Sequence, residues 1–597
     1  MARKTKKATQ TEAPLSRHRF TRLESYAQKL GRIFAYSPLP EILFIAAFIM
    51  ARWWKNSDFS YPSEMIIPLI ALAALASIVW AIYKIIFGNS LATHTAALLL
   101  SYCLYNYQWV SNTQIAKKLV QPLPDKWTSE LTTSLILSFL LAVLAGLVGW
   151  AIVKLVRSSK EIQQLQVHKV LLFVVLFLFV TQAGKSAIRL WDIRHQLAYH
   201  YPANLPNRDS SFTTPLKPDI YYLVFDRYAS ADTLKNIYGY DNSDLLDYLS
   251  NQGFVNRPSA YANYPFTMAS ASSTMAMNYF PEFEKMFNSD SSGNWQTAFP
   301  YRSILNDPPI AQVLKANGYK YNQVSSWWDF TRIGIKADAN PTESYRLNTL
   351  VGKWYLSDLQ RDIFNRSVLS PWLKRGLSAG HTPLVKYDLN RNPRQNFEAQ
   401  IEALKSLSTR GDKNVPQFSF AHFLVPHDPY IFKADGSNPD YDQNRTDNGV
   451  DETIKYTNQL SYLNKRLKNL ISYIKANSPN AVFVLQADEG PYPKEFRFEL
   501  KPGQYYDPIN LELPKMKQKF GVLASYRMPG FESEAAKEIN SSVNAFRFVL
   551  NKYLGYSLPM LSDCHLTTGD KFAVYDYRLV SSELSGQPSP EDCDQYQ

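Results

Sequence analysis

Long apolar runs gather before about residue 190, and beyond that point apolar positions alternate with polar ones. Five runs rich in Leu, Ile, Val, Ala and Phe lie at 43–54, 65–87, 91–110, 131–156 and 170–187. About 20 helical residues cross a bilayer of roughly 30 Å, and four of the runs reach that length. The first is shorter, and it spans only if it begins near Ile33. Five such runs in succession favour a five-helix transmembrane domain over buried core helices.

Basic residues close to the predicted spans give their orientation. Residues 1–35 hold nine Lys and Arg against two acids, and the loop between the last two spans is also basic. Because Lys and Arg concentrate on the cytoplasmic side, the N-terminus is predicted to lie in the cytoplasm. Five spans then place everything after about residue 210 outside. The sequence therefore predicts a multi-pass protein of the plasma membrane with an extracytoplasmic C-terminal body.

Composition limits the remaining possibilities. The net charge of +12 comes mostly from the N-terminal tail, which argues against nucleic acid as a partner. Three cysteines are too few for a disulfide scaffold or a zinc ribbon, although Cys564 and Cys593 could pair if that end is exported. With 597 residues, the chain is too long for one domain. The predicted parts are a basic tail (1–35), a transmembrane domain (36–190), a proline-containing linker (191–217) and an outer domain (218–597).

The outer domain alternates strand-like and helix-like segments. Residues 219–226, 417–425 and 481–488 are predicted to be central strands, and 319–325 and 520–526 weaker ones. Helical periodicity occurs at 243–252, 310–317, 394–407, 451–476 and 535–553. This order predicts an α/β sheet with helices on both faces. Ligand sites in such sheets lie beyond the carboxyl ends of the strands.

Acidic side chains end two of these strands. Asp226 closes the first, and Asp488 with Glu489 closes another. One acid at a strand end is often only a cap or a turn former. Three acids at the same edge repel one another unless a cation lies between them. The pattern therefore predicts a metal site.

Further polar residues surround this predicted edge. A helix is expected to begin near Thr267, whose hydroxyl is then either an N-cap or a nucleophile at the positive end of the helix. His422 lies in an alternating apolar strand, which is typical of a core histidine, whereas His427 lies in a loop and can act as an acid or base. Trp328 and Arg332 could bind a polyol or a sugar phosphate, with core packing as the alternative for the tryptophan.

Four patches, DIYYLVFD, NYPFTMAS, AHFLVPHDPY and LQADEGP, resemble the alkaline phosphatase and sulfatase superfamily. The layout is similar to its membrane-anchored, lipoteichoic-acid-synthase-like branch, which implies a sulfatase-like outer domain. The resemblance implies that Asp226 and Asp488 bind a metal, that Thr267 is the nucleophile and also contacts the metal, and that His427 is the histidine of the middle loop. It also implies that Trp328 and Arg332 bind the substrate, and His422 is a further candidate for substrate binding.

Glu489 departs from the pattern of that family, which has Asp-His-Gly where this chain has Asp488, Glu489 and Gly490. The implied ligand set of Asp226, Thr267, Asp488 and Glu489 contains only oxygen. Such a set suits one Mn²⁺, Mg²⁺ or Ca²⁺ better than Zn²⁺. Either the site works with a harder ion, or it has become a binding-only site.

The function that follows from this resemblance is a membrane-bound phosphotransferase. It would move a phosphoglycerol-like or phosphoethanolamine-like group from a lipid donor to an envelope glycan or polyol through a phosphothreonine intermediate. A phosphoesterase or sulfatase-type hydrolase and a pseudoenzyme that binds an envelope polymer are the alternatives. A transporter is not favoured, because Lys84, His94 and Lys185 lie near span ends and no intramembrane charge pair is apparent.

Overall fold

A computed structural model of the chain separates into two compact units. The first comprises Met1–Trp191 and Leu356–Thr382, and the second comprises Asp192–Tyr355 and Pro383–Gln597. The structure describes residues 34, 36–57, 60, 62–88, 90–120, 130–157, 161–197, 201, 208–209, 211–212, 217–287, 298–326, 328, 330–332, 334, 336–342, 358–370, 393–439, 451–493, 508–531, 533–569 and 574–596. Except for residue 34, the predicted basic tail lies outside these residues.

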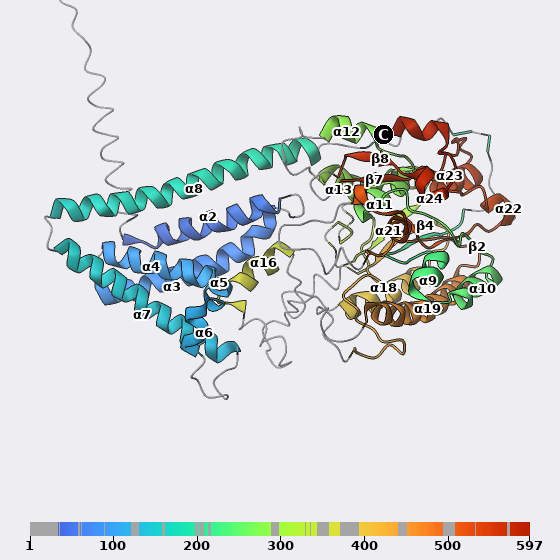
Figure 1. Ribbon diagram of the computed structural model, residues 1–597. Helices are drawn as coiled ribbons and strands as arrows, with labels where there is room; N and C mark the ends of the chain where they lie inside the picture. The colour runs from blue at the N-terminus through green and yellow to red at the C-terminus, as the bar shows by residue number, and fades with distance from the viewer. Residues whose placement is uncertain are drawn as a thin grey trace, which may run out of the picture. The chain divides into compact units, whose positions relative to one another are not determined.

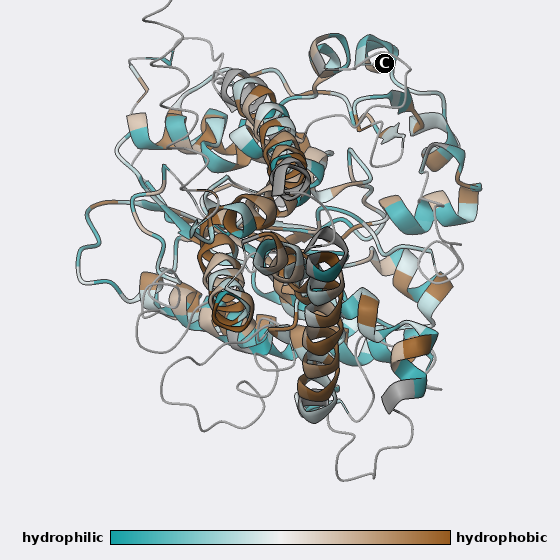
Figure 2. Cartoon of the chain, turned by 90° about the vertical axis from the view of Figure 1, so that its left-hand side faces the viewer, coloured by the Kyte–Doolittle hydropathy of each residue, from teal (hydrophilic) through white to brown (hydrophobic). Residues whose placement is uncertain are grey.

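The first unit is a bundle of apolar helices. They are α2 (Leu39–Lys55), α3 (Ile66–Phe87), α4 (Ser90–Tyr105), α7 (Glu130–Arg157) and α8 (Glu161–Leu197). Among the described residues, three stretches are long and apolar enough to cross a membrane, namely Pro62–Phe87, Thr132–Ile152 and Lys169–Trp191. Figure 2 shows the brown, apolar colouring of the long helices. The first and third predicted spans are helices of 17 and 16 residues, so five spans remain a prediction.

A buried polar contact joins two helices of this bundle. Glu41 at the start of α2 and His94 in α4 are both 0% exposed, and Oε1 of Glu41 lies 2.8 Å from Nδ1 of His94. Both residues lie in the first two turns of their helices, which agrees with the expectation that His94 lies near a span end. Sequence alone missed this contact because the two residues are 53 positions apart and meet only when α2 packs on α4.

A segment inserted in the second half of the chain belongs to the first unit. Its helix α16 (Asp358–Arg366) carries Asp362, which forms an ion pair with Arg52 at the end of α2. The Gln360 side chain donates to the carbonyl of Glu64 at 3.1 Å. Just after the helix, the Val368 amide donates to Leu104 at 2.8 Å. These contacts attach part of the predicted 218–597 domain to the helical bundle.

A six-stranded sheet forms the centre of the second unit. Its order is β2 (Val255–Asn256), β6 (Ala524–Arg527), β5 (Val482–Gln486), β1 (Ile220–Phe225), β4 (Gln417–Phe423) and β3 (Lys320–Val324). Strands β5, β1, β4 and β3 are parallel, and β6 pairs antiparallel with both β5 and β2 at one side. The sheet is therefore mixed, and its four parallel strands end at one edge.

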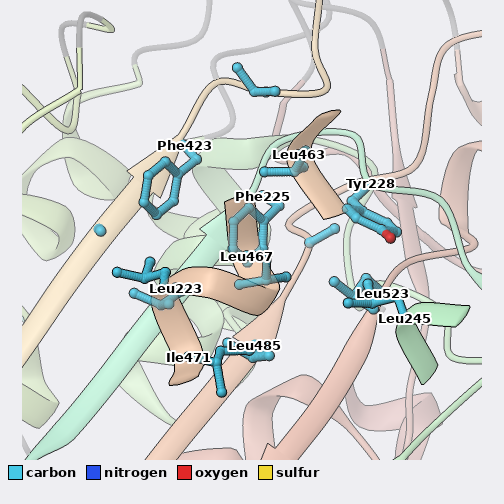
Figure 3. Close-up of a cluster of buried hydrophobic side chains, with 14 of the residues drawn as sticks. Leu223, Phe225, Tyr228, Leu245, Phe423, Leu463, Leu467, Ile471, Leu485 and Leu523 are labelled. Carbon is cyan, nitrogen blue, oxygen red and sulfur yellow. The ribbon is translucent and has the colours of Figure 1, made fainter. Parts of the chain in front are cut away.

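Apolar side chains on alternate positions bury both faces of this sheet. In β1, Leu223 and Phe225 face one cluster, and Tyr222 and Val224 face the other. Figure 3 shows the first cluster, where leucines of α19 (Glu452–Asn477) pack on β1, β4 and β5. The helix α23 (Ala545–Leu554), labelled in Figure 1, contributes to the second cluster, as does α14 (Pro309–Ala316). A continuous apolar strand buried on both faces is what a central parallel strand requires.

Most predicted elements of the sheet domain match within two residues, including α10 (Ser243–Asn251), α18 (Pro393–Ser408) and α19. The helix predicted over 535–553 is wrong. The chain instead forms α22 (Ser533–Ala536), a 3-10 turn and α23. Asn544 bonds to the side chain of Asn540 and to the carbonyl of Leu561, and such local bonds compete with a continuous helix. The strand predicted over 520–526 is shorter because α21 (Leu513–Phe520) occupies its start.

A disulfide joins Cys564 and Cys593 in the second unit, with 5.6 Å between their Cα atoms. It lies in an aromatic cluster beside the small sheet of β7 (Leu566–Thr568) and β8 (Tyr577–Leu579). Disulfides persist in oxidising compartments. The pairing fits the export that the sequence predicts for this end of the chain.

A buried histidine beside this disulfide makes stability depend on pH. Burial opposes protonation of His565, but the Asp563 carboxylate at 3.5 Å and the Ala262 carbonyl outweigh it and raise the His565 pKa. A raised folded-state pKa gives stability that is complete below the unfolded value of about 6.5 and is lost as pH rises through the folded value. We expect Asp563→Asn to reduce this loss. The measurement is the thermal unfolding temperature of the wild type and of Asp563→Asn from pH 5 to 8. The same dependence on pH in both proteins would contradict this expectation.

Candidate metal centre and nucleophile

Three strand ends bring Asp226, His422 and Asp488 together. Asp226 follows β1, His422 lies in β4, and Asp488 follows β5, and β1 pairs with both neighbours. One ligand atom from each residue lies within 4.8 Å of the others. The Nε2 atom of His422 is 3.8 Å from Oδ2 of Asp226 and 3.7 Å from Oδ2 of Asp488. We call these three residues the acid–histidine cluster.

The acid–histidine cluster is buried and leaves polar atoms unsatisfied. Its members are 1% to 4% exposed. Among the described residues, Oδ1 of Asp226, both carboxylate oxygens of Asp488 and Nε2 of His422 have no hydrogen-bond partner. Buried polar atoms without partners are rare in folded proteins, because each costs about 1–3 kcal/mol. Four of them in one small cluster are the arrangement that a bound cation would satisfy.

The pKa shifts of the acid–histidine cluster also indicate a cation site. Burial and the neighbouring Asp488 charge raise the pKa of Asp226 well above its ordinary value. Burial also raises the pKa of Asp488, which the Thr267 hydroxyl partly offsets. Burial lowers the pKa of His422 to about 3, so its imidazole is neutral. Neutral imidazole and carboxylates that are hard to ionise without a counter-charge suit a metal site.

A hydrogen bond to Nδ1 orients the His422 ring. Its Nδ1 atom lies 3.0 Å from the Thr331 hydroxyl, which leaves Nε2 directed at the two carboxylates. The Gln400 side chain donates to the His422 carbonyl at 2.8 Å and fixes the strand there. Such supporting bonds set the tautomer and the orientation of histidines that ligate metals.

Thr267 begins a helix that faces the cluster. The helix α11 (Thr267–Ala276) starts where the sequence predicted it, after Phe266 in an extended conformation. The Thr267 hydroxyl is close enough to Asp488 to lower its pKa. The first backbone N–H groups of a helix carry partial positive charge and attract anions. Thr267 therefore combines a hydroxyl, a carboxylate neighbour and an anion-attracting helix end.

Glu489 lies outside the acid–histidine cluster. Its Oε1 atom accepts from Nε of Arg227 at 3.0 Å, and its Oε2 atom lies 2.8 Å from Nζ of Lys519. All three side chains are largely buried. Burial lowers the Lys519 pKa to about 8 although Glu489 opposes this, so the ammonium stays mostly protonated at neutral pH. The Glu489 carboxylate thus neutralises two cations, and the imidazole in the cluster comes from His422 instead.

His427 lies in the loop after β4 beside the cluster. Its amide donates to the Asp226 carbonyl at 3.1 Å, and Nδ1 contacts both the carbonyl and the carboxylate of Asp428, the latter at 3.1 Å. Burial beside Arg227 lowers the His427 pKa to about 4. The imidazole is therefore neutral, and because Nδ1–H donates to Asp428, Nε2 is the basic nitrogen.

A cavity of about 210 Å³ connects these groups, and we call it the nucleophile cavity. Asp226, Thr267, His427 and Glu489 line it, together with Trp328, whose ring is 5.6 Å from the His422 ring. Arg332 is half-buried and does not line it. The structure therefore gathers Asp226, Thr267, Asp488, His422, His427 and Trp328 at one edge of the sheet.

Three residues near the site escaped the sequence analysis. Arg227 follows Asp226 directly, with a backbone φ of +60° that directs its side chain across the strand ends. Its guanidinium lies 4.1 Å from the Tyr492 ring centroid, and the Lys519 ammonium lies 3.7 Å from the same centroid. The adjacency of Arg227 to Asp226 was a usable signal. Lys519 gave none, because it lies in a lysine-rich helix typical of a solvated surface.

A family model described as Sulfatase matches residues 218–531, which is more than half of the chain. The chain belongs to the sulfatase family. The matched segment begins before β1 and ends after β6, so it includes every strand of the six-stranded sheet and every residue of the acid–histidine cluster. No curated protein sequence matches the chain.

Several solved structures are similar to this sulfatase-family chain over much of their length. The zinc complex of the C-terminal periplasmic domain of EcEptC from Escherichia coli is 13% identical with a TM-score of 0.36, covering 63% of this chain and 96% of that chain. Lipooligosaccharide phosphoethanolamine transferase A from Neisseria meningitidis is 12% identical with a TM-score of 0.35, covering 88% and 97%. The lipoteichoic acid synthase LtaP from Listeria monocytogenes is 12% identical with a TM-score of 0.35, covering 68% and 94%.

Proposed function

We propose that the chain is a membrane-bound, metal-dependent phosphotransferase of the sulfatase family. It moves a phospho-alcohol group from a lipid donor to a hydroxyl of a cell-envelope acceptor through a phosphothreonine at Thr267. One observation carries this proposal: a buried cluster of two carboxylates and an imidazole, with four unsatisfied polar atoms, lies beside a threonine at a helix N-terminus. The cluster would hold the cation, and the threonine would supply the nucleophile.

Asp226, Asp488 and His422 would hold one divalent cation, with the Thr267 oxygen as a further ligand. The donor set fits such an ion, because carboxylates and a neutral imidazole are common ligands and their facing atoms are unsatisfied. A set that includes His422 in place of Glu489 also suits Zn²⁺, so the expectation of Mn²⁺ or Mg²⁺ stays a prediction. When bound, the ion supplies positive charge that lowers the pKa of a ligated hydroxyl and neutralises phosphate oxygens.

Thr267 performs the first displacement. Its hydroxyl gives its proton to His427 and its oxygen attacks phosphorus, the bond from phosphorus to the lipid alcohol breaks, and the leaving oxygen takes that proton from His427. The backbone N–H groups at the start of α11 stabilise charge on the phosphoryl oxygens. A hydroxyl of the acceptor then attacks the phosphothreonine, and the bond from phosphorus to the Thr267 oxygen breaks. Water in place of the acceptor would make the same site a hydrolase.

His427 transfers the protons in both steps. Its Nδ1 contacts with Asp428 leave Nε2 to accept a proton from the incoming hydroxyl. Its pKa of about 4 keeps it neutral at physiological pH. We expect kcat/KM to hold steady as pH falls from 7 to 5. The pH–rate profile checks this, and an acid limb near 6.5, the ordinary histidine value, would contradict it.

The predicted topology places this site on the extracytoplasmic side, where the lipid donor and the envelope acceptor would both be accessible. Two observations support that placement. The second unit contains the disulfide of Cys564 and Cys593. Within the first unit, α16 and the residues just after it contact the ends of α2 and α4 and the turn before α3. In the predicted topology the chain crosses the membrane once before the end of α2 and three times before the end of α4. Both ends would therefore lie on the side opposite the N-terminus.

Metal analysis of the full-length protein in detergent tests the proposed centre. We expect about one divalent ion per chain and loss of turnover after chelation. His422→Ala should weaken metal affinity at least about tenfold, because it removes the only nitrogen ligand of the cluster. Glu489→Gln should bind metal more tightly than His422→Ala, and the reverse order would contradict the assignment of His422 as the ligand.

A pseudoenzyme is the second candidate, and the position of Glu489 favours it. Where the resembled family has a metal-binding histidine, this chain has a carboxylate paired with Arg227 and Lys519. Equilibrium dialysis separates the two candidates. Absence of a bound ion at saturating Mn²⁺ and at saturating Zn²⁺ would support the pseudoenzyme and exclude the metal-dependent transferase.

A further inference from the structure

A second cavity adjoins the nucleophile cavity in the second unit. Its volume is about 240 Å³, and Arg227, His427 and Tyr492 line both cavities. Thr267 and Asp226 line only the nucleophile cavity. These shared side chains would lie between a phosphoryl group beside Thr267 and the second cavity. Since His427 is one of them, a hydroxyl bound in the second cavity would lie next to the His427 side chain.

The walls of the second cavity are aromatic and tied together by hydrogen bonds. Tyr238 and Tyr456 have ring centroids 4.7 Å apart, and the Tyr456 hydroxyl donates to the Arg227 carbonyl at 2.8 Å. Gln518 donates to the Tyr238 hydroxyl at 2.9 Å. Tyr430 donates to Glu452 at 2.8 Å. These bonds fix the rings in place before any ligand binds, as a built binding site requires.

The charges around the cavity favour a neutral ligand. Three carboxylates and two cations line it. Each carboxylate already has a partner: Asp428 pairs with Arg227, Asp451 accepts from the Thr453 amide at 2.7 Å, and Glu452 accepts from Tyr430. A cation would have to compete with these partners, and an anion would meet an excess of carboxylates. A neutral group with many hydroxyls can instead bond to the mixed donors and acceptors and stack on the rings.

We propose that the second cavity is the acceptor subsite and binds a neutral, hydroxyl-rich group, a sugar ring or a polyol. Its volume lies below the roughly 300–1,000 Å³ of pockets for drug-sized ligands, which suits one small ring. The role as acceptor subsite rests on the proposed transferase function, whereas the binding of a sugar does not. One hydroxyl of the bound group would give up its proton to Nε2 of His427 and bond to phosphorus, while the bond from phosphorus to the Thr267 oxygen breaks.

Binding to the full-length protein tests the subsite without any need for turnover. The probe is methyl β-glucoside, observed by saturation-transfer NMR. Ile237→Trp fills the cavity from α9 (Ala231–Tyr238), where Ile237 is 44% exposed, so the larger ring has room outward and the fold is retained. Ile454→Trp is the matched control, because Ile454 is 53% exposed on α19 and does not line the cavity. Gln518→Ala is a milder second variant that removes one donor.

We expect the wild type and Ile454→Trp to bind the glucoside alike. We expect binding at least about tenfold weaker in Ile237→Trp, a loss of about 1.4 kcal/mol, and a smaller loss in Gln518→Ala. Equal binding in all four proteins, or no glucoside binding by the wild type, overturns the proposal. So does binding of choline in preference to the glucoside, which would make the cavity a site for cations.

The same proteins separate this proposal from the proposed function. After a phospholipid has formed the Thr267 adduct, methyl β-glucoside should accelerate its loss in the wild type and in Ile454→Trp, and about tenfold less in Ile237→Trp. If the wild type loses the adduct at the same rate with and without the glucoside, the acceptor role is overturned. If the glucoside binds as expected but no phospholipid forms an adduct, the transferase function fails and the sugar site stands.

Discussion

Glu489→His is expected to inactivate and destabilise the protein, although it restores the Asp-His-Gly pattern that the sequence resembles. The Glu489 carboxylate is shared by Arg227 and Lys519, at 3.0 and 2.8 Å. Removing it leaves two cations in a buried site without their common counter-charge. Breaking a buried ion pair on one side costs about 3–5 kcal/mol. Denaturant unfolding of the purified protein measures this loss, and the rate of phospholipid turnover measures the inactivation.

Two variants make this result specific to the charge. Glu489→Gln should be destabilised to a similar extent, because it keeps the shape and loses the charge. Glu512→Gln is the matched control, since Glu512 has a side chain that is 78% exposed and pairs with Lys515 only at 3.8 Å. A stable Glu489→His protein with more bound metal than the wild type would show that Glu489 occupies a ligand position. That outcome would contradict the role of this carboxylate as a counter-charge.

Thr267→Ala is expected to lower phosphotransfer at least about a thousandfold, because it removes the atom that bonds to phosphorus. Folding should be unaffected, because Phe266 and not Thr267 is the N-cap of α11. The bound metal should largely remain, because the acid–histidine cluster is intact. The measurement is the steady-state turnover of a labelled phospholipid, with metal content determined on the same sample.

Thr267→Ser and Thr457→Ala complete this test. The serine variant keeps a hydroxyl and should retain measurable turnover. Thr457 lies on α19 away from both cavities, and its hydroxyl bonds only within its own helix, so its alanine variant controls for the loss of a threonine methyl and hydroxyl. Wild-type turnover in Thr267→Ala would remove Thr267 from the mechanism.

The sheet of the second unit could be predicted because its strands are buried on both faces. Every residue of β1, β4 and β5 is buried, and β1 and β5 are apolar at nearly every position, which distinguishes central parallel strands from surface ones. The same property predicted that Asp226 and Asp488 meet, since parallel strands end at one edge. The apolar pattern could not predict which way the side chains of the residues that follow each strand point. Glu489 is adjacent to Asp488 in sequence but points toward Lys519, a partner that comes from α21.

His422 shows a different limit. An apolar strand that contains one histidine is usually a core strand, and the residue is indeed buried. Its ligand-like position arises because it pairs in register with Val224, two residues before Asp226, so that its ring reaches the strand ends. Register between strands almost 200 residues apart is a property of the fold. Likewise, the pairing of Glu41 with His94 depends on the packing of two helices, which the hydropathy of either helix leaves open.

Mass spectrometry of the purified full-length protein after exposure to phospholipid vesicles tests the central claim most directly. With vesicles of phosphatidylglycerol or phosphatidylethanolamine, the transferase predicts a phospho-alcohol adduct on the peptide that contains Thr267. The adduct should be absent in Thr267→Ala and after removal of divalent ions. An adduct on another residue, or an unmodified Thr267 in a metal-loaded protein that turns over phospholipid, would contradict the mechanism.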